Sequence, residues 1–338
     1  MQSIAFSFRE FDRELIKHLS EKISLNLSTY SFSSFLLGIS FPKALPPDET
    51  ALLKKEFQFA LVKELGKKLH ATADFEKPEV CVTIDFNSKK IFLHVSSLFL
   101  HGIYKKFSRN LAQTIFYCPK CRGRGCAECS FRGKLGIKTI QELIAEPLVK
   151  AFQAKDNKFH GAGREDVDVR MLGNGREFVL ELIEPKKRKA NLRELQKGVN
   201  RKNKRRISVK NLCYVEKNSV SLLKESKSEK IYEAVVSCRK NLSREGIKKL
   251  KNAGFTVFQR TPERVSGRRA DLVRERKAKI LKTKILSKKT FSLRMLAESG
   301  LYVKEFVSGD GGRTIPSISS LLGNNCGCRQ LDVVKILR

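Results

Sequence analysis

The N-terminal third of the chain carries a clear helical pattern followed by two strand-like segments. Between residues 48 and 70, apolar residues recur at helical spacing, and Asp48 can cap the first turn. The recurring positions are Leu53, Phe57, Leu61, Leu65 and Leu69. Residues 80–86 and 90–98 are rich in β-branched and aromatic residues, and the Asn87–Ser88 pair between them suits a turn. The pattern predicts one helix followed by a strand pair.

The rest of the chain alternates between helical and strand-like patterns. A helix is expected at 139–152 and a strand at 178–183. Further on we expect, in order, a strand at 231–237, a helix that Ser243 caps and Gly254 ends, a strand at 255–259, a long basic strand pair within 270–296, and an ordered segment at 302–307. The change of character near residues 103–115 predicts a domain boundary there.

One segment is dominated by positive charge. Residues 186–206 are almost unrelieved lysine and arginine, and Glu194 is their only acid. Because charge runs of this kind favour solvent, we expect an exposed loop or arm.

Length, composition and charge narrow the class of protein. The 338 residues suffice for two domains, and 41% apolar residues can fill their cores. A formal charge of +33 predicts a nucleic acid as partner. Membrane insertion is not expected, since the longest apolar candidate, 32–41, is far shorter than the roughly 20 residues that a span needs. The first residues lack the layout of a signal peptide, so the cytoplasm is the expected location.

Four of the nine cysteines form two Cys-x-x-Cys pairs separated by four residues. They are Cys118, Cys121, Cys126 and Cys129. Each pair can present two thiolates to one tetrahedral zinc ion, and four protein ligands would make that zinc structural. Two cysteine-bearing turns without a metal are the alternative. Lys120, Arg122 and Arg124 in these loops would serve as phosphate contacts.

The densest polar segment, residues 160–176, packs three acids and three arginines between glycines. Glycines let the backbone approach a ligand closely, and a carboxylate such as Asp166 beside a cation can act as a nucleophile or a base. A surface turn with ion pairs is the alternative. Asp168 lies two residues further on, and in an extended segment it would point the same way as Asp166, so composition does not choose between them.

The run Gly163–Arg176, followed by 178–182, closely resembles the catalytic motif of a known family. This family comprises the archaeal and eukaryotic tRNA pseudouridine synthases that modify positions fifty-four and fifty-five of the T-arm. Further segments resemble the family's signatures in their proper order, namely residues 96–102, 104–109, 259–262, 268–272, 302–307 and 312–314. The resemblance thus extends over most of the chain.

The resemblance implies an α+β fold in two domains. An N-terminal RNA-binding domain of the THUMP type would span residues 1–110, and the cysteine segment would span 111–135. A catalytic domain built on a mixed, mostly antiparallel sheet flanked by helices would span 136–338. Binding of the tRNA T-arm by a monomer is the expectation, with no membrane partner and no cofactor for catalysis.

The resemblance also assigns roles to particular residues. Asp166 matches the catalytic aspartate. Tyr232 resembles the tyrosine that stacks on the uracil and assists removal of the C5 proton, and Lys304 the basic residue beside the aspartate. Leu331 resembles the apolar residue that packs against the base, and Arg164 one that holds the flipped nucleotide. The alternatives are a core aromatic for Tyr232, a surface lysine on a strand for Lys304, a core leucine for Leu331 and a structural ion pair for Arg164.

In such enzymes the target uridine is flipped into a pocket and the carboxylate attacks either ribose C1′ or the base. The glycosidic bond breaks, the uracil rotates, and C5 joins C1′. This chain departs from the family pattern at Gly267 and Ser308, where a histidine is expected, and near its start, where many relatives carry a further Cys-x-x-Cys pair.

Two other functions fit parts of the sequence. A non-catalytic RNA-binding protein with zinc would explain the charge and the cysteines but would not need Asp166. Another THUMP-bearing modifier, a thiolase or a methyltransferase, would need a glycine-rich nucleotide loop, and none is evident.

Overall fold

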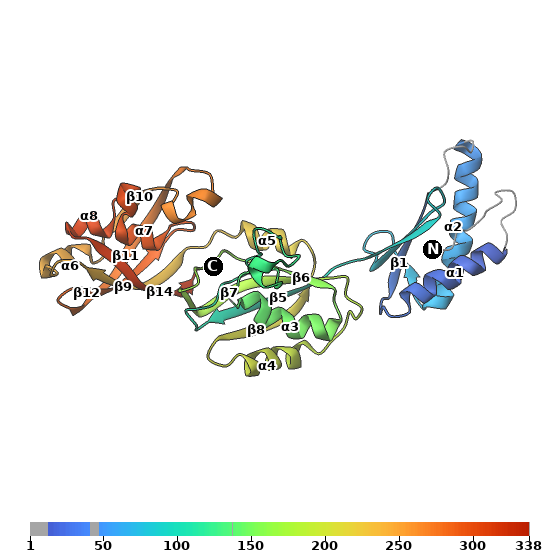
Figure 1. Ribbon diagram of the computed structural model, residues 1–338, viewed down its shortest axis with the longest axis horizontal. Coiled ribbons are helices and arrows are strands. Elements are labelled where there is room, and N and C mark those ends of the chain that lie inside the picture. Colours follow the sequence, from blue (N-terminus) through green and yellow to red (C-terminus); the bar gives the residue numbers. More distant parts are fainter. Residues whose placement is uncertain (1–12, 41–46, 137, 338) are drawn as a thin grey trace.

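The structure, a computed structural model, describes residues 13–40, 47–136 and 138–337. Its N-terminal part forms a separate α/β unit with its own core. The elements are α1 (Arg13–Leu27), β1 (Ser34–Ser40), α2 (Pro47–Leu69), β2 (Thr72–Ala73), β3 (Val80–Asp85) and β4 (Lys90–Val95). The sheet order is β2-β1-β3-β4, with β1 parallel to β2 and β3 and with β4 antiparallel. This unit lies at one end of the molecule (Figure 1).

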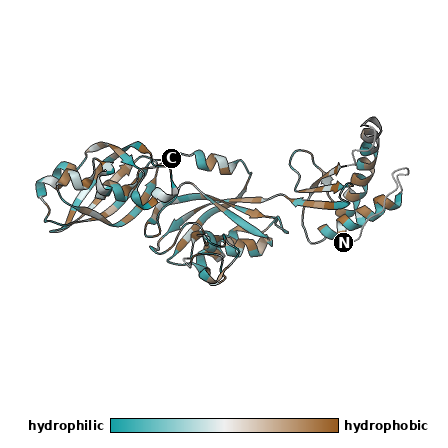
Figure 2. Ribbon diagram, turned by 45° about the horizontal axis from the view of Figure 1, so that its top comes forward, coloured by the Kyte–Doolittle hydropathy of each residue, from teal (hydrophilic) through white to brown (hydrophobic). Residues whose placement is uncertain are grey.

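The amphipathic pattern explains why these elements fold together. Phe57, Leu61 and Leu65 lie on one face of α2, where each is at most 1% exposed, and they pack in one cluster with apolar residues of α1 and the strands. The predicted helix and the strand pair with its turn are therefore confirmed. Brown and teal positions alternate along these elements in Figure 2, as expected for elements with one buried face.

The remainder of the chain is organised around one ten-stranded sheet. Its strands are β5 (Leu98–Lys106), β6 (Asp156–Gly161), β7 (Arg170–Ile183), β8 (Ile207–Val215), β9 (Lys230–Cys238), β10 (Gly254–Arg260), β11 (Val273–Ser287), β12 (Thr290–Ala297), β13 (Thr314–Ile315) and β14 (Cys326–Ile336). The order is β13-β10-β11-β12-β9-β14-β7-β5-β8, and β6 also pairs with β7. Only the short β14–β7 pairing is parallel among the described strands of this sheet. The predicted α+β class with a mixed, mostly antiparallel sheet is confirmed.

Helices flank this sheet. They are α3 (Ile140–Phe152), α4 (Leu192–Lys202), α5 (Ser219–Glu225), α6 (Arg244–Leu250), α7 (Val303–Ser308) and α8 (Ile318–Leu322), with 3-10 turns η1 (Ala127–Cys129), η2 (Glu263–Arg268) and η3 (Asp310–Gly312). Thr139 caps α3 by accepting a hydrogen bond from the Glu142 amide, and Ser243 caps α6 in the same way through Gly246. The helices predicted at both places are confirmed.

The sequence analysis was wrong in two places. First, β5 pairs with β7 and β8, so residues 98–106 belong to the large sheet and not to an N-terminal domain ending at 110. Second, the predicted arm at 186–206 contains α4, whose Val199 is 1% exposed and packs in the core of the large sheet. The alternative considered for Lys304, a surface lysine on an alternating strand, does not apply, because Lys304 lies on the short helix α7.

The two parts of the chain contact each other through a few polar pairs. Arg188 donates to the Glu79 carboxylate at 2.9 Å and to the Ser96 carbonyl at 2.8 Å, and the Ser31 amide donates to the Lys186 carbonyl at 2.7 Å. The segment before α4 is thus a contact surface for the N-terminal unit. Within the described residues, no helix combines the length and the apolar character that a bilayer span requires.

Candidate active site

Asp166 lies in a turn between β6 and β7, and two cations contact its carboxylate. Lys304 on α7 places its Nζ 3.2 Å from Oδ2, and Arg264 in η2 donates to Oδ1 at 3.2 Å. The side chain of Asp166 remains 37% exposed. The turn is closed by the Val169 amide, which donates to the Asp166 carbonyl at 3.1 Å. The structure therefore brings Asp166 and Lys304 together, as the sequence predicted, from positions far apart in the chain.

Lys304 also contacts Asp168, so one ammonium serves two carboxylates. Its Nζ donates to both Asp168 oxygens at 2.7 and 2.8 Å. Burial lowers the pKa of Lys304, but the bond to Asp168 and the charges of both aspartates outweigh burial and raise it. Burial likewise acts to raise the pKa of Asp168, but Lys304 outweighs it and lowers that pKa. Lys304 thus stays charged across neutral pH.

Arg264 is a site residue that the sequence analysis missed. Its guanidinium contacts Asp166, donates to Glu305 at 2.6 Å, and lies 6.0 Å from the centre of the Tyr302 ring. Burial lowers its pKa, but the hydrogen bond and charge of Glu305 raise it more strongly, so the net shift is upward. Its position two residues after the 259–262 signature was the available signal. Only the fold brings this segment to Asp166.

Tyr232 and Leu331 lie on neighbouring strands close to this turn. Tyr232 on β9 pairs with Val333 on β14, and Leu331 pairs with Ala234. Burial raises the pKa of the half-buried Tyr232, and the charges of Glu165 and Asp166 raise it further, while Arg176 opposes them. Leu331 is 5% exposed, so its side chain belongs to the core in the free chain.

Arg109 connects the turn to β14. Its Nη1 donates to the carbonyls of Asp168 at 2.9 Å and Leu331 at 3.0 Å, and its Nη2 donates to Asp332 at 2.6 Å. Asp332 also accepts from Arg170 Nε at 2.9 Å. These bonds fix the turn that carries the aspartates against the final strand of the sheet.

Arg164 points to a different neighbour. Its guanidinium carbon lies 5.1 Å from the centre of the Phe116 ring. Arg164 forms no ion pair with a carboxylate in the part of the chain that the structure describes. The structural ion pair considered for this residue is therefore not what holds it, and its part in RNA binding stays a prediction.

A buried polar network lies directly beside Asp166. Arg176 and Glu165 form an ion pair at 2.8 Å with both side chains 1% exposed. The Tyr104 hydroxyl donates to Glu165 at 2.7 Å, and Gln113 donates to that hydroxyl and to the Gly163 carbonyl. Gly163 has a φ of +86°, and a Cβ there would lie 2.7 Å from Arg176. The Arg176 Nη1 also donates to the Ala162 carbonyl at 2.5 Å, while its Nε lies at ion-pair distance from Glu165 without a well-aligned hydrogen bond. Hydrogen bonds to both charged side chains help such a buried network to hold a site rigid.

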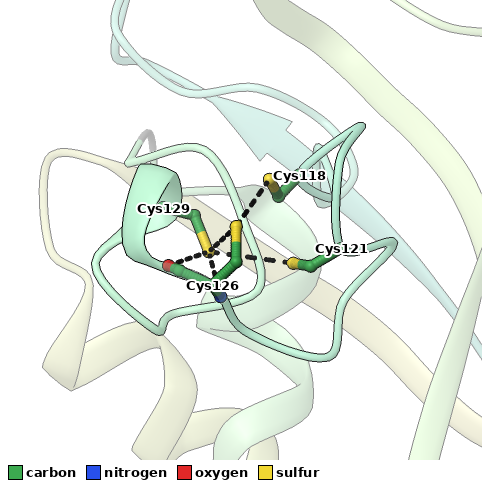
Figure 3. Close-up of side chains that lie close together, drawn as sticks. All are labelled: Cys118, Cys121, Cys126 and Cys129. Carbon is green, nitrogen blue, oxygen red and sulfur yellow. Dashed lines mark hydrogen bonds between the residues drawn. The ribbon is translucent and has the colours of Figure 1, made fainter.

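The four predicted cysteines converge in one cluster (Figure 3). Their sulfur atoms all lie within 4.8 Å of one another, and the pairs Cys118–Cys126, Cys121–Cys129 and Cys126–Cys129 are each 3.8 Å apart. Zinc–sulfur bonds of about 2.3 Å in a tetrahedron give sulfur–sulfur edges of about 3.8 Å. The donor set and its spacing therefore fit zinc.

Backbone amides support thiolates in this cluster. The amides of Cys126 and Gly133 donate to the Cys129 sulfur at 3.3 and 3.2 Å, and the Gly125 amide donates to Cys121 at 3.2 Å. Burial raises the pKa of Cys129, but these hydrogen bonds and those from neighbouring thiols lower it to about 6. A thiolate favoured in this way is the form that binds a metal.

The turn at Asp166 thus combines an accessible carboxylate, two cations and a rigid buried support. Ionisable groups with shifted pKa values that gather at one accessible turn are typical of an active site. The fold and this site therefore define an enzyme as the class of protein.

The comparisons with known proteins name the family. The family described as "Pus10, C-terminal" matches residues 99–337. The "tRNA pseudouridine synthase Pus10" of Methanocaldococcus jannaschii is 39% identical over 335 residues, which are 96% of this chain and 73% of that protein. The protein of the same name from Methanothermobacter marburgensis is 40% identical, covering 97% of this chain and 84% of its own length. The chain belongs to the Pus10 family of pseudouridine synthases, and the predicted isomerase is confirmed.

Solved structures show a more distant likeness. A chain from a structure described as "Crystal Structure of a Cbf5-Nop10-Gar1 Complex" is 14% identical, covers 58% of this chain and 44% of its own, and gives a TM-score of 0.35. This likeness is too distant to inform the site.

Proposed function

We propose that this chain isomerises uridine to pseudouridine in the T-arm of tRNA, at position fifty-four, position fifty-five or both, with Asp166 as the nucleophile. The observation that carries the proposal is the Asp166 carboxylate, accessible to solvent and contacted by Lys304 and Arg264 at 3.2 Å each. A carboxylate that two cations hold in place and that stays open to solvent can meet a substrate carbon as a nucleophile.

The proposed reaction needs no redox step. The carboxylate bonds to ribose C1′ or to the base, and the bond between N1 and C1′ breaks. After the uracil rotates, C5 bonds to C1′ and the bond between the carboxylate and the substrate breaks, which frees Asp166. C5 then loses its proton and N1 gains one. Tyr232 would stack on the uracil, and its phenol, kept neutral by its raised pKa, would stay near the C5 proton. Leu331 would pack against the base after a local rearrangement, and Arg164 would hold the flipped nucleotide.

Electrostatics support an RNA substrate. The net charge of +33 attracts a phosphate backbone irrespective of sequence. We propose that residues 13–95 act as the RNA-binding domain of the THUMP type and that a structural zinc held by the four cysteines rigidifies the adjacent segment. The zinc would supply folding free energy there and no step of the reaction.

Asp166→Asn tests the nucleophile directly. Asparagine keeps the volume of the side chain but not its charge, so tRNA binding should persist while turnover falls by at least about 10³-fold. Pseudouridine has the mass of uridine, so carbodiimide labelling of an unmodified tRNA transcript would measure product. Two transcripts, each with one of the two T-arm uridines replaced by cytidine, would show which position is modified.

Asp168→Asn is the matched control. Both residues lie in the same turn and both contact Lys304. If Asp168→Asn abolished turnover while Asp166→Asn did not, the nucleophile would be Asp168. If neither change affected turnover, the whole turn would be excluded as the catalytic centre.

A further inference from the structure

Lys106 is a buried cation that the proposed mechanism does not use. It lies at the end of β5 with 0% of its surface exposed, within the 104–109 segment that the sequence analysis singled out. Its Nζ donates three hydrogen bonds of 2.9 Å, to the carbonyls of Leu111, Asp166 and Val167. An ammonium group has three donors, and here each finds one carbonyl.

Two of these carbonyls belong to the turn that carries the catalytic carboxylate. The Asp166 and Val167 carbonyls point at Lys106 from beneath the turn, while the Asp166 side chain faces Lys304 and Arg264 on the other side. The β5 backbone is itself fixed, since Lys106 pairs with Met171 on β7 and with Ile207 on β8. The ammonium therefore ties the turn to a strand that is paired on both sides, between β7 and β8.

We infer that Lys106 is a positioning residue, whose ammonium holds the 166–169 turn so that the Asp166 carboxylate meets the substrate in reactive geometry. This inference rests on the proposed role of Asp166. Displacing a carboxylate by about 1 Å from its reactive position lowers the rate by roughly 10²-fold. The gain in rate from a fixed backbone can therefore outweigh the cost of burying the Lys106 ammonium.

The inferred role makes the site sensitive to the protonation of Lys106. Burial lowers its pKa to about 8, although Glu165, Asp168 and Asp166 act in the opposite direction, and Arg176 lowers it further. Below that pKa the ammonium has a donor for every carbonyl. Above it the neutral amine has only two, so one of the three carbonyls loses its partner and the turn loosens.

The first measurement compares Lys106→Met with Lys105→Met. Methionine keeps the bulk of the buried stem without donors, and Lys105 is the neighbouring lysine on the opposite face of β5. We expect single-turnover isomerisation to slow by about 10- to 100-fold in Lys106→Met, with tRNA affinity within about twofold of wild type. Lys105→Met should keep the wild-type rate. A wild-type rate per folded Lys106→Met enzyme would overturn the inference.

The second measurement separates positioning from mere stability. The rate of the wild-type enzyme should fall as pH rises through about 8, and Lys106→Arg, whose guanidinium stays charged, should keep its rate over the same range. A lysine that only stabilised the fold would change the melting temperature and leave the pH profile of the folded enzyme alone. An identical alkaline fall in both enzymes would contradict the inference.

A third readout needs neither activity nor a variant. The Val169 amide donates a hydrogen bond to the Asp166 carbonyl. Above pH 8 its hydrogen exchange should accelerate by more than the intrinsic, base-catalysed increase in exchange rate. Amides in the centre of β7 serve as the reference. No such excess would overturn the inference. If the wild-type enzyme showed the excess exchange but isomerised no tRNA uridine, the proposed function would fail while the tether of the turn by Lys106 would stand.

Discussion

At the scale of single residues, the site is organised by cations that each serve two partners. Lys304 contacts Asp166 and Asp168, and Arg264 contacts Asp166 and Glu305. Shared partners restrict each side chain more than a single contact would, so the Asp166 carboxylate keeps one orientation before the substrate arrives. The same contacts must yield in part when the substrate binds, because both cations lie against the atoms that would attack.

Lys304→Met is therefore expected to slow turnover by about 10- to 100-fold while leaving tRNA affinity nearly unchanged. The loss should be incomplete because Arg264 still contacts Asp166. Lys304 lowers the pKa of Asp168, so their ion pair stabilises the folded protein fully above the ordinary pKa of 3.8. This stabilisation is lost as pH falls through the lower pKa that Asp168 has in the folded state. Carbon-13 NMR titration of the Asp168 carboxyl should accordingly show an upward shift in Lys304→Met.

Arg294→Gln is a suitable control for that change. Arg294 pairs with Glu233 at 3.5 Å, and in the described part of the chain it forms no ion pair with Asp166 or Asp168. Its loss should alter neither turnover nor the Asp168 titration. An unchanged rate in Lys304→Met would show that turnover does not need the contact between Lys304 and Asp166.

The sequence identified some of these residues and had no means to identify others. Asp166 and Lys304 were found because a motif resemblance marks them. Arg264 and Lys106 lie 98 and 60 positions from Asp166 along the chain. The Glu165–Arg176 pair is buried, where charged side chains are not expected. No periodic pattern in the sequence indicates such contacts. Arg164 was assigned a nucleotide contact, and the structure gives it the Phe116 ring.

At the scale of elements, predictability followed the clarity of the local pattern. The helix α2 and the cap at Thr139 were predicted because apolar spacing and capping chemistry act within a few residues. The helix α4 was missed because eleven basic residues in 186–206 conceal the stripe formed by Leu192, Leu195 and Val199. The assignment of β5 to the large sheet depends on pairing with distant residues such as Met171, the partner of Lys106, which local sequence does not encode.

We expect the order of the cysteine segment to depend on the proposed zinc. Around the four sulfur atoms the backbone of residues 118–133 forms tight turns, with left-handed φ at Arg122, Gly123 and Ser130. Among the described residues, the buried cluster at these turns consists of the cysteines themselves. If the proposed zinc is bound, the free energy of its binding should be the main source of order in these turns.

Removal of zinc with a chelator, or Cys118→Ser, should disorder this segment and lower the melting temperature, while the N-terminal unit keeps its structure. Elemental analysis of protein purified without chelator should give one zinc per chain. Cys213→Ser, a change at an exposed cysteine outside the cluster, is the control and should leave the zinc content intact. A zinc-free protein with the same melting temperature would count against the metal site.

At the scale of the whole molecule, the positive charge is spread over many elements, but one basic surface lies close to the site. The amides of Phe107 and Ser108 donate to the Arg206 carbonyl at 2.9 and 3.4 Å, and the next residue, Arg109, contacts the turn with Asp168. The loop after α4 therefore contacts the segment 107–109, and that segment in turn contacts the 166–169 turn. Figure 1 shows α4 beneath the middle of the molecule and α6 at the end farthest from the N-terminal unit.

This placement predicts which cations contact RNA. Replacing the exposed Arg201, Lys204 and Arg205 by glutamine should weaken tRNA binding and reduce its salt dependence. Each lost phosphate contact lowers the slope of log affinity against log salt by about 0.7 to 0.9, so the triple change should lower it by about 2 to 3. The measurement is tRNA affinity between about 50 and 200 mM salt, compared with wild type.

The matched control removes the same number of charges from α6. Lys248 and Lys249 are exposed on α6, and the exposed Lys251 follows directly as its C-cap. This helix contacts β11 and α8. If RNA binds beside the active-site turn, their replacement by glutamine should change the slope by less than about 1, because a distant charge beyond the Debye length of about 10 Å is screened. Equal changes from both triples would instead mean that the net field of the protein, and not a defined surface at the end of α4, holds the RNA.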